Sequence, residues 1–356
     1  MNKAFVTGML RSGTTLVEKV LHNHPRISIA SQPFFFFYVA LKEAFNRTHG
    51  LTPLMPLSTQ FGPEAYPPQR LVDFLNEYAP TREELQGALH RHRAAPYRES
   101  LVVTERLADE IQSGGGLMPA GDLIDRLHTL VGEVYPKEAL AFVGSKEVLC
   151  EEYIPFFLSR GWKVVLVIRD VRDVIASLNA PGGARWTGAP RPTLYNIRNW
   201  RKSVTYASQY GDDRNLLVCR YEDLIASHAG WIRLFGFLGV SPSGRYGQLF
   251  DQHGRPWEGN SSFGARRGVE APCPADRKTP LNRAERLFVQ KLTLTELQSL
   301  GYEVGDLEET AAFDLRHFRE RPTERPEFAE FLRRYDKELA AEEQRFETLL
   351  SQPATV

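Results

Sequence analysis

The sequence predicts an α/β protein with a central parallel sheet flanked by helices. Three observations predict this fold class. The chain opens with an apolar strand, a short loop and a helix; a strand–helix–strand unit lies near residue 150; and residues 163–168 are apolar without alternation. A continuously apolar strand is typical of a parallel sheet that is covered on both faces. Two parallel strands joined by a helix form a βαβ unit, so helices and strands should alternate along the chain.

The individual elements follow from apolar spacing and from turn residues. The predicted strands cover residues 4–9, 141–143, 163–168 and 216–219, with one further strand in 99–110. The predicted helices cover residues 16–23, 121–134, 151–159 and 171–178. Residues 50–100 are rich in Pro, Gly, Gln and charge, which indicates a loop-and-helix insertion outside the sheet. From about residue 305 the chain is charged, with apolar residues at helical spacing.

Composition excludes several classes of protein. Lys+Arg and Asp+Glu are equal at 44 each, whereas a general nucleic-acid binder carries a basic excess. The three cysteines (Cys150, Cys219 and Cys273) lack the close spacing of a zinc site or a disulfide framework, and the histidines are scattered. The longest apolar run, residues 33–41, is too short to span a bilayer. We therefore expect a cytoplasmic protein with no nucleic-acid partner, no membrane span and no metal.

The first loop, "GMLRSGTT" (Gly8–Thr15), almost matches the phosphate loop G-x-x-x-x-G-K-[ST], but Thr14 stands in the place of the lysine. The loop opens a helix, and the free N–H groups of a helix N-terminus bind oxyanions. Gly13 allows the backbone to approach an anion closely. Hydroxyl donors come from Ser12, Thr14 and Thr15, and Arg11 is the one cation in the loop. These residues predict a loop that can hold an anion without the phosphate-binding lysine and without a metal.

A second candidate group follows the apolar strand 163–168. Arg169 comes directly after this strand, so it should lie at the carboxyl edge of the sheet, where α/β proteins bind ligands. Ser177 lies eight residues further on, about two turns along the next helix. An arginine at this position favours a binding role over a solvated charge cluster.

Taken together, these motifs resemble those of the sulfotransferases that use 3′-phosphoadenosine 5′-phosphosulfate (PAPS). "GMLRSGTTLVEKVLHNHP" is similar to the 5′-phosphosulfate loop, in the style of the protein-tyrosine sulfotransferases and their bacterial relatives. "RDVRDVIAS" resembles the 3′-phosphate site, in which an arginine and a serine eight positions later hold the phosphate. "VCRYEDLI" resembles the segment whose tyrosine lies beside the adenine, which indicates Tyr221. The weaker C-terminal matches of the nucleotide-covering stretch are Ser261, Ser262 and Arg277.

The resemblance implies a P-loop-like three-layer fold and an in-line transfer of SO₃ from PAPS to a hydroxyl or amine, releasing 3′-phosphoadenosine 5′-phosphate (PAP). It implies that Arg11 lies at the breaking bond, where fixed positive charge stabilises the leaving phosphate. Thr14 and Thr15 would hold the 5′-phosphate, and Arg169 with Ser177 the 3′-phosphate. The implied sulfotransferase domain covers residues 1–304, with 45–140 as an insertion that shapes the acceptor site and 305–356 as a helical extension.

The proton acceptor departs from the family pattern. Relatives carry a carboxylate about twenty residues after the loop arginine, but Gln32 occupies this place, and an amide cannot take a proton at neutral pH. Glu147 is the preferred substitute, with Lys146 beside it to steady the sulfonate. The alternative substitutes are Glu105 and Asp109.

The acceptor is expected to be a small molecule, lipid, sugar or natural product. If the run "PFFFFY" is extended, alternate rings face opposite sides, and Phe34 and Phe36 would form an apolar acceptor wall. Trp186 and Trp257 could join them, although core packing is the other reading of these aromatic residues.

Two other functions stay open at this point. An ATP-dependent kinase would use Asp170 as a magnesium ligand, but Thr14 in place of lysine opposes it. A nucleotide-binding regulator with a degenerate site is supported by Gln32 and opposed by Arg11, Arg169 and Ser177.

Overall fold

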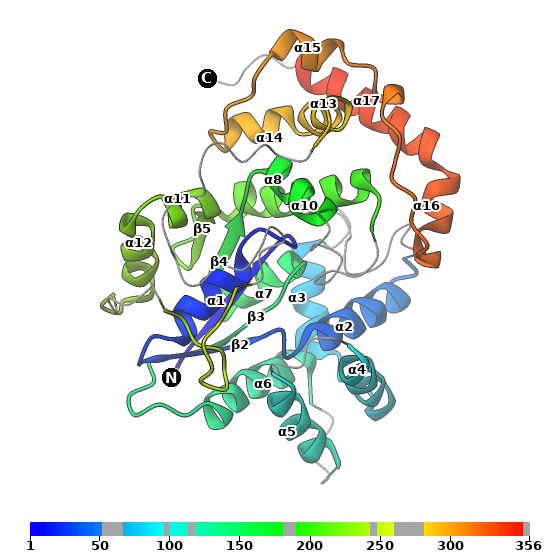
Figure 1. The fold of residues 1–356 in the computed structure, drawn as a ribbon. Coiled ribbons are helices and arrows are strands. Elements are labelled where there is room, and N and C mark those ends of the chain that lie inside the picture. The colour runs from blue at the N-terminus through cyan, green and yellow to red at the C-terminus, as the bar shows by residue number, and fades with distance from the viewer. Residues whose placement is uncertain are drawn as a thin grey trace.

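A five-stranded parallel sheet forms the centre of the protein (Figure 1). The computed structural model describes residues 1–51, 67–95, 100–112, 118–180, 190–242, 248–259 and 281–351. The strands are β1 (Asn2–Gly8), β2 (Ile27–Ser31), β3 (Phe142–Lys146), β4 (Lys163–Ile168) and β5 (Leu216–Arg220). Their order is β2-β3-β1-β4-β5, and every neighbouring pair is parallel. The carboxyl ends of all five strands therefore lie at one edge of the sheet.

Helices surround this sheet (Figure 1). They are α1 (Thr14–His22), α2 (Phe35–Thr48), α3 (Pro68–Glu77), α4 (Arg82–Ala94), α5 (Leu101–Gln112), α6 (Ala120–Val134), α7 (Ile154–Ser159), α8 (Val171–Asn179), α10 (Thr193–Tyr210), α11 (Tyr221–Ala226), α12 (His228–Leu238), α13 (Arg283–Leu292), α14 (Leu294–Ser299), α15 (Leu307–Ala312), α16 (Ala329–Arg333) and α17 (Tyr335–Ser351), with short 3-10 turns at η2 (Glu151–Tyr153), η3 (Leu315–His317) and η4 (Pro326–Phe328).

Two hydrophobic cores lie on the two faces of the sheet. Successive residues of a strand point to opposite faces. Phe5 of β1 accordingly belongs to the larger core, whereas its neighbours Ala4 and Val6 belong to the smaller one. The larger core takes side chains from α2, α6 and α10, and the smaller core takes them from α1 and α12. This arrangement is a three-layer α/β fold, as the sequence predicts.

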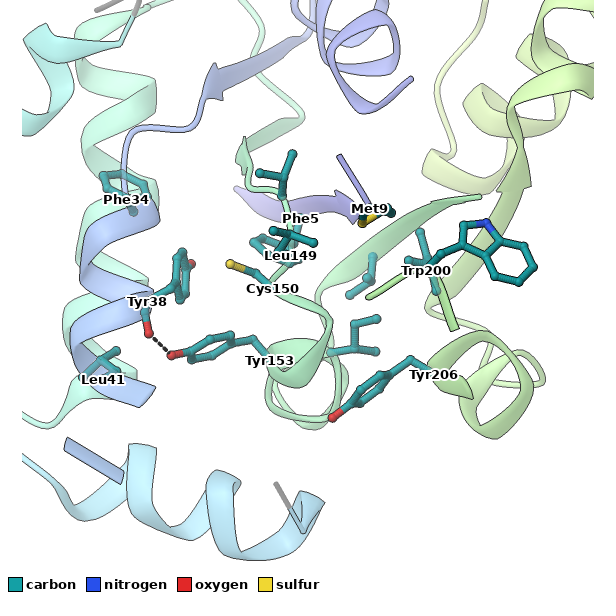
Figure 2. Close-up of a cluster of buried hydrophobic side chains, with 14 of the residues drawn as sticks. Phe5, Met9, Phe34, Tyr38, Leu41, Leu149, Cys150, Tyr153, Trp200 and Tyr206 are labelled. Atoms are coloured by element: carbon teal, nitrogen blue, oxygen red, sulfur yellow. Dashed lines mark hydrogen bonds between the residues drawn. The ribbon is translucent and has the colours of Figure 1, made fainter. Parts of the chain in front are cut away.

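The larger core reaches the sheet edge that carries the candidate site. Figure 2 shows Phe5 and Met9 of the first strand and loop close to Leu149 and Cys150, with Trp200 of α10 nearby. All five side chains are buried. The loops after β1 and β3 are therefore backed by packed side chains, which gives the site a rigid support.

The prediction of a strand in residues 99–110 is wrong, because most of this segment belongs to helix α5. Val103 and Leu107 are buried and lie four residues apart, on one face of the helix, and α5 packs between α4 and α6. The β-branched residues suggested a strand, but β propensity depends strongly on context.

The extended conformation expected for "PFFFFY" is also wrong. Helix α2 begins at Phe35, and Phe34 is its N-cap. Strand β2, immediately before this run, was not predicted, although all five of its residues are buried. The other predicted strands and helices are present, with ends shifted by a few residues. The largest change at the site is in β3, which extends to Lys146.

The C-terminal helices pack on the main body. Leu315, Phe318, Phe328, Phe331 and Leu339 all belong to the larger core. Ion pairs join Arg198 of α10 to Glu338 and Glu342 of α17. Among the helices of the described ranges, none combines the length and apolar character needed to cross a membrane.

Candidate active site

The loop after β1 folds tightly against the start of α11. Gly13 is the N-cap of α1 and has a φ of 98°, a left-handed conformation that favours glycine. A Cβ atom added to Gly13 would lie 2.3 Å from Cδ2 of Tyr221. Within the described residues, no side chain caps the first turn of α1. Glycine is thus required for the close approach of the loop to Tyr221, and the N–H groups of the helix N-terminus remain directed at the site.

Arg11 and Ser177 meet in the structure, although 166 residues separate them in the sequence. Arg11 Nε donates a hydrogen bond to Ser177 Oγ over 3.0 Å. Arg169 Nη1 donates to the carbonyl oxygen of Arg11 over 3.3 Å. Arg11 adopts a φ of 65°, which is uncommon for a residue with a side chain. The three residues predicted to bind the nucleotide therefore lie together at the carboxyl edge of the sheet.

Positive charge is concentrated at this point. Burial and, to a smaller extent, the guanidinium of Arg169 together lower the pKa of Arg11 from 12.5 to about 10. Both effects disfavour the charged form of Arg11 in the ligand-free protein. An anion placed between the two guanidinium groups would relieve this repulsion, so the geometry is that of an anion site.

Arg169 is held from several sides. Its Nη2 donates to Asp173 Oδ2 over 3.2 Å, and its guanidinium carbon lies 4.7 Å from the centre of the Tyr221 ring. Its Nε atom is buried and has no hydrogen-bond partner among the described residues. A buried N–H group without a partner is costly. This orphan donor, the neighbouring arginines and the loop glycine fit an anionic ligand.

The second part of the site lies at the ends of β2 and β3. Lys146 Nζ donates to Gln32 Oε1 over 2.9 Å. Gln32 has a φ of 50°, and its Nε2 atom is buried without a partner in the described part of the chain. Because a lysine can only donate, it fixes the orientation of the Gln32 amide.

Glu147 follows directly and is completely buried. Its Oε1 atom accepts a hydrogen bond of 2.9 Å from the Phe34 N–H, at the start of α2. Its Oε2 atom has no partner within the described ranges. Burial raises the pKa of the Glu147 carboxyl from 4.5 to about 8, against the opposing effects of the Phe34 N–H and Lys146.

Three other carboxylates are committed elsewhere. Both oxygens of Asp170 bind the guanidinium of Arg172, and Asp170 also caps α8. Glu105 pairs with Arg93, and this hydrogen-bonded pair lowers the pKa of its carboxyl. Asp109 is exposed on α5. None of the three is completely buried, as Glu147 is.

The aromatic residues predicted to form the acceptor wall differ in burial and in the residues that they contact. Phe34 is fully buried and packs edge-on against His128. Phe36 is partly buried and lies beside Phe35. Trp257 packs against the smaller core. Four predicted site residues, Trp186, Ser261, Ser262 and Arg277, lie outside the described residues.

Sequence reasoning missed the residues that hold the site in place. Trp200 Nε1 donates to the carbonyl oxygen of Arg169 over 2.7 Å. Glu222 Oε1 accepts from the Asp170 N–H over 3.0 Å. Trp200 stands in no motif, and a tryptophan within a helix usually indicates core packing. Glu222 belongs to "VCRYEDLI", but only Tyr221 of this segment was predicted to be a site residue. For Glu222, its position two residues after β5, at the same sheet edge, was the available signal.

The fold and the site are those of an α/β protein with an anion-binding edge, and a family model matches its N-terminal part. Residues 4–107 match the model of the sulfotransferase family. The match covers β1, α1, β2 and α2, and with them Arg11 and Gln32. It supports the assignment of this chain to the sulfotransferase family, in agreement with the motifs of the sequence. No curated protein matches the sequence.

Solved structures of sulfotransferases are similar to this one over most of its length. The sulfotransferase domain from the Synechococcus PCC 7002 olefin synthase has 17% identity and a TM-score of 0.46, covering 85% of this chain and 96% of that one. The sulfotransferase domain from the curacin biosynthetic pathway has 14% identity and a TM-score of 0.43, covering 85% and 98%. A sulfotransferase from Alicyclobacillus acidocaldarius has 11% identity and a TM-score of 0.40, covering 85% and 97%.

Proposed function

We propose that this sulfotransferase takes its sulfonate group from PAPS and transfers it to a hydroxyl or amine of a small-molecule, lipid, sugar or natural-product acceptor, with PAP as the second product. One observation carries the proposal: Arg11, Arg169 and Ser177, from distant segments, converge beside the glycine loop at the carboxyl edge of the sheet. When bound, PAPS supplies an activated sulfonate and a phosphate leaving group.

The residues of this cluster have distinct tasks. Arg11 stabilises the negative charge that develops on the leaving phosphate. The loop N–H groups, with Ser12, Gly13, Thr14 and Thr15, hold the 5′-phosphate. Arg169 and Ser177 hold the 3′-phosphate, and Tyr221 lies beside the adenine. The orphan Nε donor of Arg169 supports this assignment, because it has a hydrogen bond left to give. Ser261, Ser262 and Arg277 are proposed to complete the nucleotide site.

Glu147 is the proposed proton acceptor. A general base works best when its pKa lies near the working pH, and burial raises the pKa of Glu147 to about 8. Its Oε2 atom, without a partner in the described residues, is the atom that would accept the proton. Lys146, which is hydrogen-bonded to Gln32, is proposed to steady the sulfonate. Phe34, Phe36 and Trp186 stay proposed acceptor contacts.

The kinase alternative finds no support at the site. A phosphate-loop kinase needs a lysine where Thr14 stands and a free carboxylate for magnesium. Asp170 is bound to Arg172 through both oxygens.

We propose that the sulfotransferase domain spans residues 1–304 and that the protein acts in the cytoplasm without a metal.

Two variants test the proposed function. Release of PAP from PAPS is measured with a panel of hydroxyl and amine acceptors, and also with water alone. Arg11→Ala should lower turnover by roughly 10²–10³-fold and weaken PAP binding much less, because Arg11 acts on charge that develops during transfer. Arg169→Ala should mainly weaken PAP binding. Equal losses of turnover and PAP affinity in Arg11→Ala would reduce Arg11 to a binding residue, and unchanged PAP affinity in Arg169→Ala would remove the 3′-phosphate assignment.

A further inference from the structure

Helix α10 touches the backbone of two loops of the proposed site. Trp200 reaches the loop after β4, and Lys202, two residues later, reaches the loop after β3. Both side chains are almost completely buried. Each of the two side chains donates a hydrogen bond to a backbone carbonyl oxygen of its loop. Neither bond uses a side chain that is proposed to bind the substrate.

The bond from Trp200 fixes the residue that is proposed to hold the 3′-phosphate. The indole Nε1 donates to the Arg169 carbonyl oxygen over 2.7 Å. The N–H of the same peptide group, that of Asp170, donates to Glu222. Both polar groups of the Arg169–Asp170 peptide are therefore held, and the direction of the Arg169 side chain is fixed with them.

The bond from Lys202 fixes a strained turn. Leu149 has a φ of 59°, a left-handed conformation that is strained for a residue with a branched side chain. Its carbonyl oxygen accepts from Lys202 Nζ over 3.1 Å and from Lys42 Nζ over 3.3 Å. Its N–H donates to the Gly8 carbonyl oxygen over 3.1 Å. Such strain persists only where the surroundings determine the conformation, and this turn lies two residues after Glu147.

Two buried carboxylates pair with the two lysines. Lys202 Nζ lies 2.9 Å from Glu151 Oε2 and 2.7 Å from Glu152 Oε1, and Lys42 Nζ lies 3.5 Å from Glu152 Oε1. Burial acts to lower the pKa of Lys202, but the two carboxylates outweigh it and raise the pKa. The cluster of Lys42, Glu151, Glu152 and Lys202 is thus balanced, and both lysines can donate to the carbonyl oxygen of Leu149.

We propose that α10 positions the active site through two residues with separate effects: Trp200 orients Arg169 for the 3′-phosphate, and Lys202 holds the Leu149 turn that places Glu147. Both act through other residues and are positioning residues, not catalytic ones. The inference rests on the proposed function, since it takes the roles of Arg169 and Glu147 from there.

The Trp200 part is tested by ligand binding with and without the 3′-phosphate. Trp200→Phe should weaken PAP about tenfold and change the affinity for AMP less than twofold. In an Arg169→Ala background, the same change should have less than a twofold effect on PAP. Trp231→Phe, which alters a buried tryptophan of the smaller core, is the control and should leave both affinities unchanged.

Two outcomes would overturn this part. One is an equal loss of PAP and AMP affinity in Trp200→Phe, as expected for a merely structural role. The other is an undiminished effect of Trp200→Phe in the Arg169→Ala background. If Arg169→Ala alone left PAP affinity unchanged, the proposed function would fail instead, so the two failures are distinguishable.

The Lys202 part is tested by turnover and its pH dependence. Lys202→Met alone leaves a buried carboxylate unbalanced, which is strongly destabilising. Lys202→Met/Glu152→Gln keeps the cluster neutral. Glu152→Gln alone keeps both lysines but leaves them one buried carboxylate fewer, and it is the control for the loss of that carboxylate. The double variant should release PAP from PAPS about tenfold more slowly and shift the pH profile of turnover, with PAP affinity within twofold. A folded double variant with an unchanged rate and pH profile, or an equal change in the control, would overturn the proposal.

Discussion

Replacement of Arg11 by methionine should stabilise the ligand-free protein while it removes activity. In the ligand-free fold the pKa of Arg11 falls from 12.5 to about 10 through burial and the nearby Arg169 guanidinium. Each pKa unit corresponds to about 1.4 kcal/mol. Keeping Arg11 charged therefore costs the folded state roughly 3 kcal/mol at neutral pH.

Methionine removes this cost but also removes one interaction. It keeps a long apolar stem in the same space, and it loses the hydrogen bond from Arg11 Nε to Ser177 Oγ. Such a bond contributes about 1 kcal/mol, more when one partner is charged. The net gain in the free energy of unfolding should be about 1–2 kcal/mol. Proteins commonly give up stability at sites that bind charged ligands.

The assay is urea unfolding of wild type and Arg11→Met without ligand, in a chelating buffer at pH 7. Arg172→Met is the matched control. Asp170 raises the pKa of Arg172 against the effect of burial, so loss of that arginine should destabilise the protein. A free energy of unfolding that is lower by more than about 1 kcal/mol in Arg11→Met than in wild type would refute the reasoning, because the loop would then not hold an unfavourable charge.

Three further variants test other parts of the structure. Glu147→Gln should abolish a fall in stability between about pH 5 and 8, because the folded state, with its pKa raised to about 8, binds this proton more tightly than the unfolded chain. Gly13→Ala should weaken PAP about tenfold, since its Cβ would lie 2.3 Å from Tyr221. Glu342→Ala should lower the free energy of unfolding by about 3 kcal/mol, because it leaves two arginines of α10 short of a buried partner.

For each of these three predictions, one result would contradict the expected outcome. For Glu147→Gln it is a pH dependence of urea unfolding equal to that of wild type. For Gly13→Ala it is unchanged PAP affinity by calorimetry, and for Glu342→Ala an unfolding free energy within about 0.5 kcal/mol of wild type, as at an ordinary surface position. Glu343→Ala, next along α17 and only partly buried, is the control for Glu342.

The nucleotide half of the site could be predicted from the sequence because its residues follow strands. Arg11 and Arg169 come after β1 and β4, and parallel neighbouring strands bring their carboxyl ends together. Ser177 was indicated by the resemblance of "RDVRDVIAS" to a 3′-phosphate motif. Its hydrogen bond with Arg11 was not predicted.

The supporting residues could not be predicted in this way. Nothing local in the sequence indicates that Leu149 adopts a left-handed conformation or that Lys202 reaches its carbonyl oxygen. Both depend on how α10 packs against the sheet. The strand β2 was missed for a related reason, since its five residues look ordinary and form a strand because β3 lies beside them.

The most direct test of the central claim is calorimetric binding of PAP and AMP in a chelating buffer, to wild type and to Arg169→Ala. The proposed function predicts that wild type binds PAP without magnesium and at least tenfold more tightly than AMP, and that Arg169→Ala binds the two ligands about equally. Binding of ATP only with magnesium, or equal affinity of wild type for PAP and AMP, would contradict it.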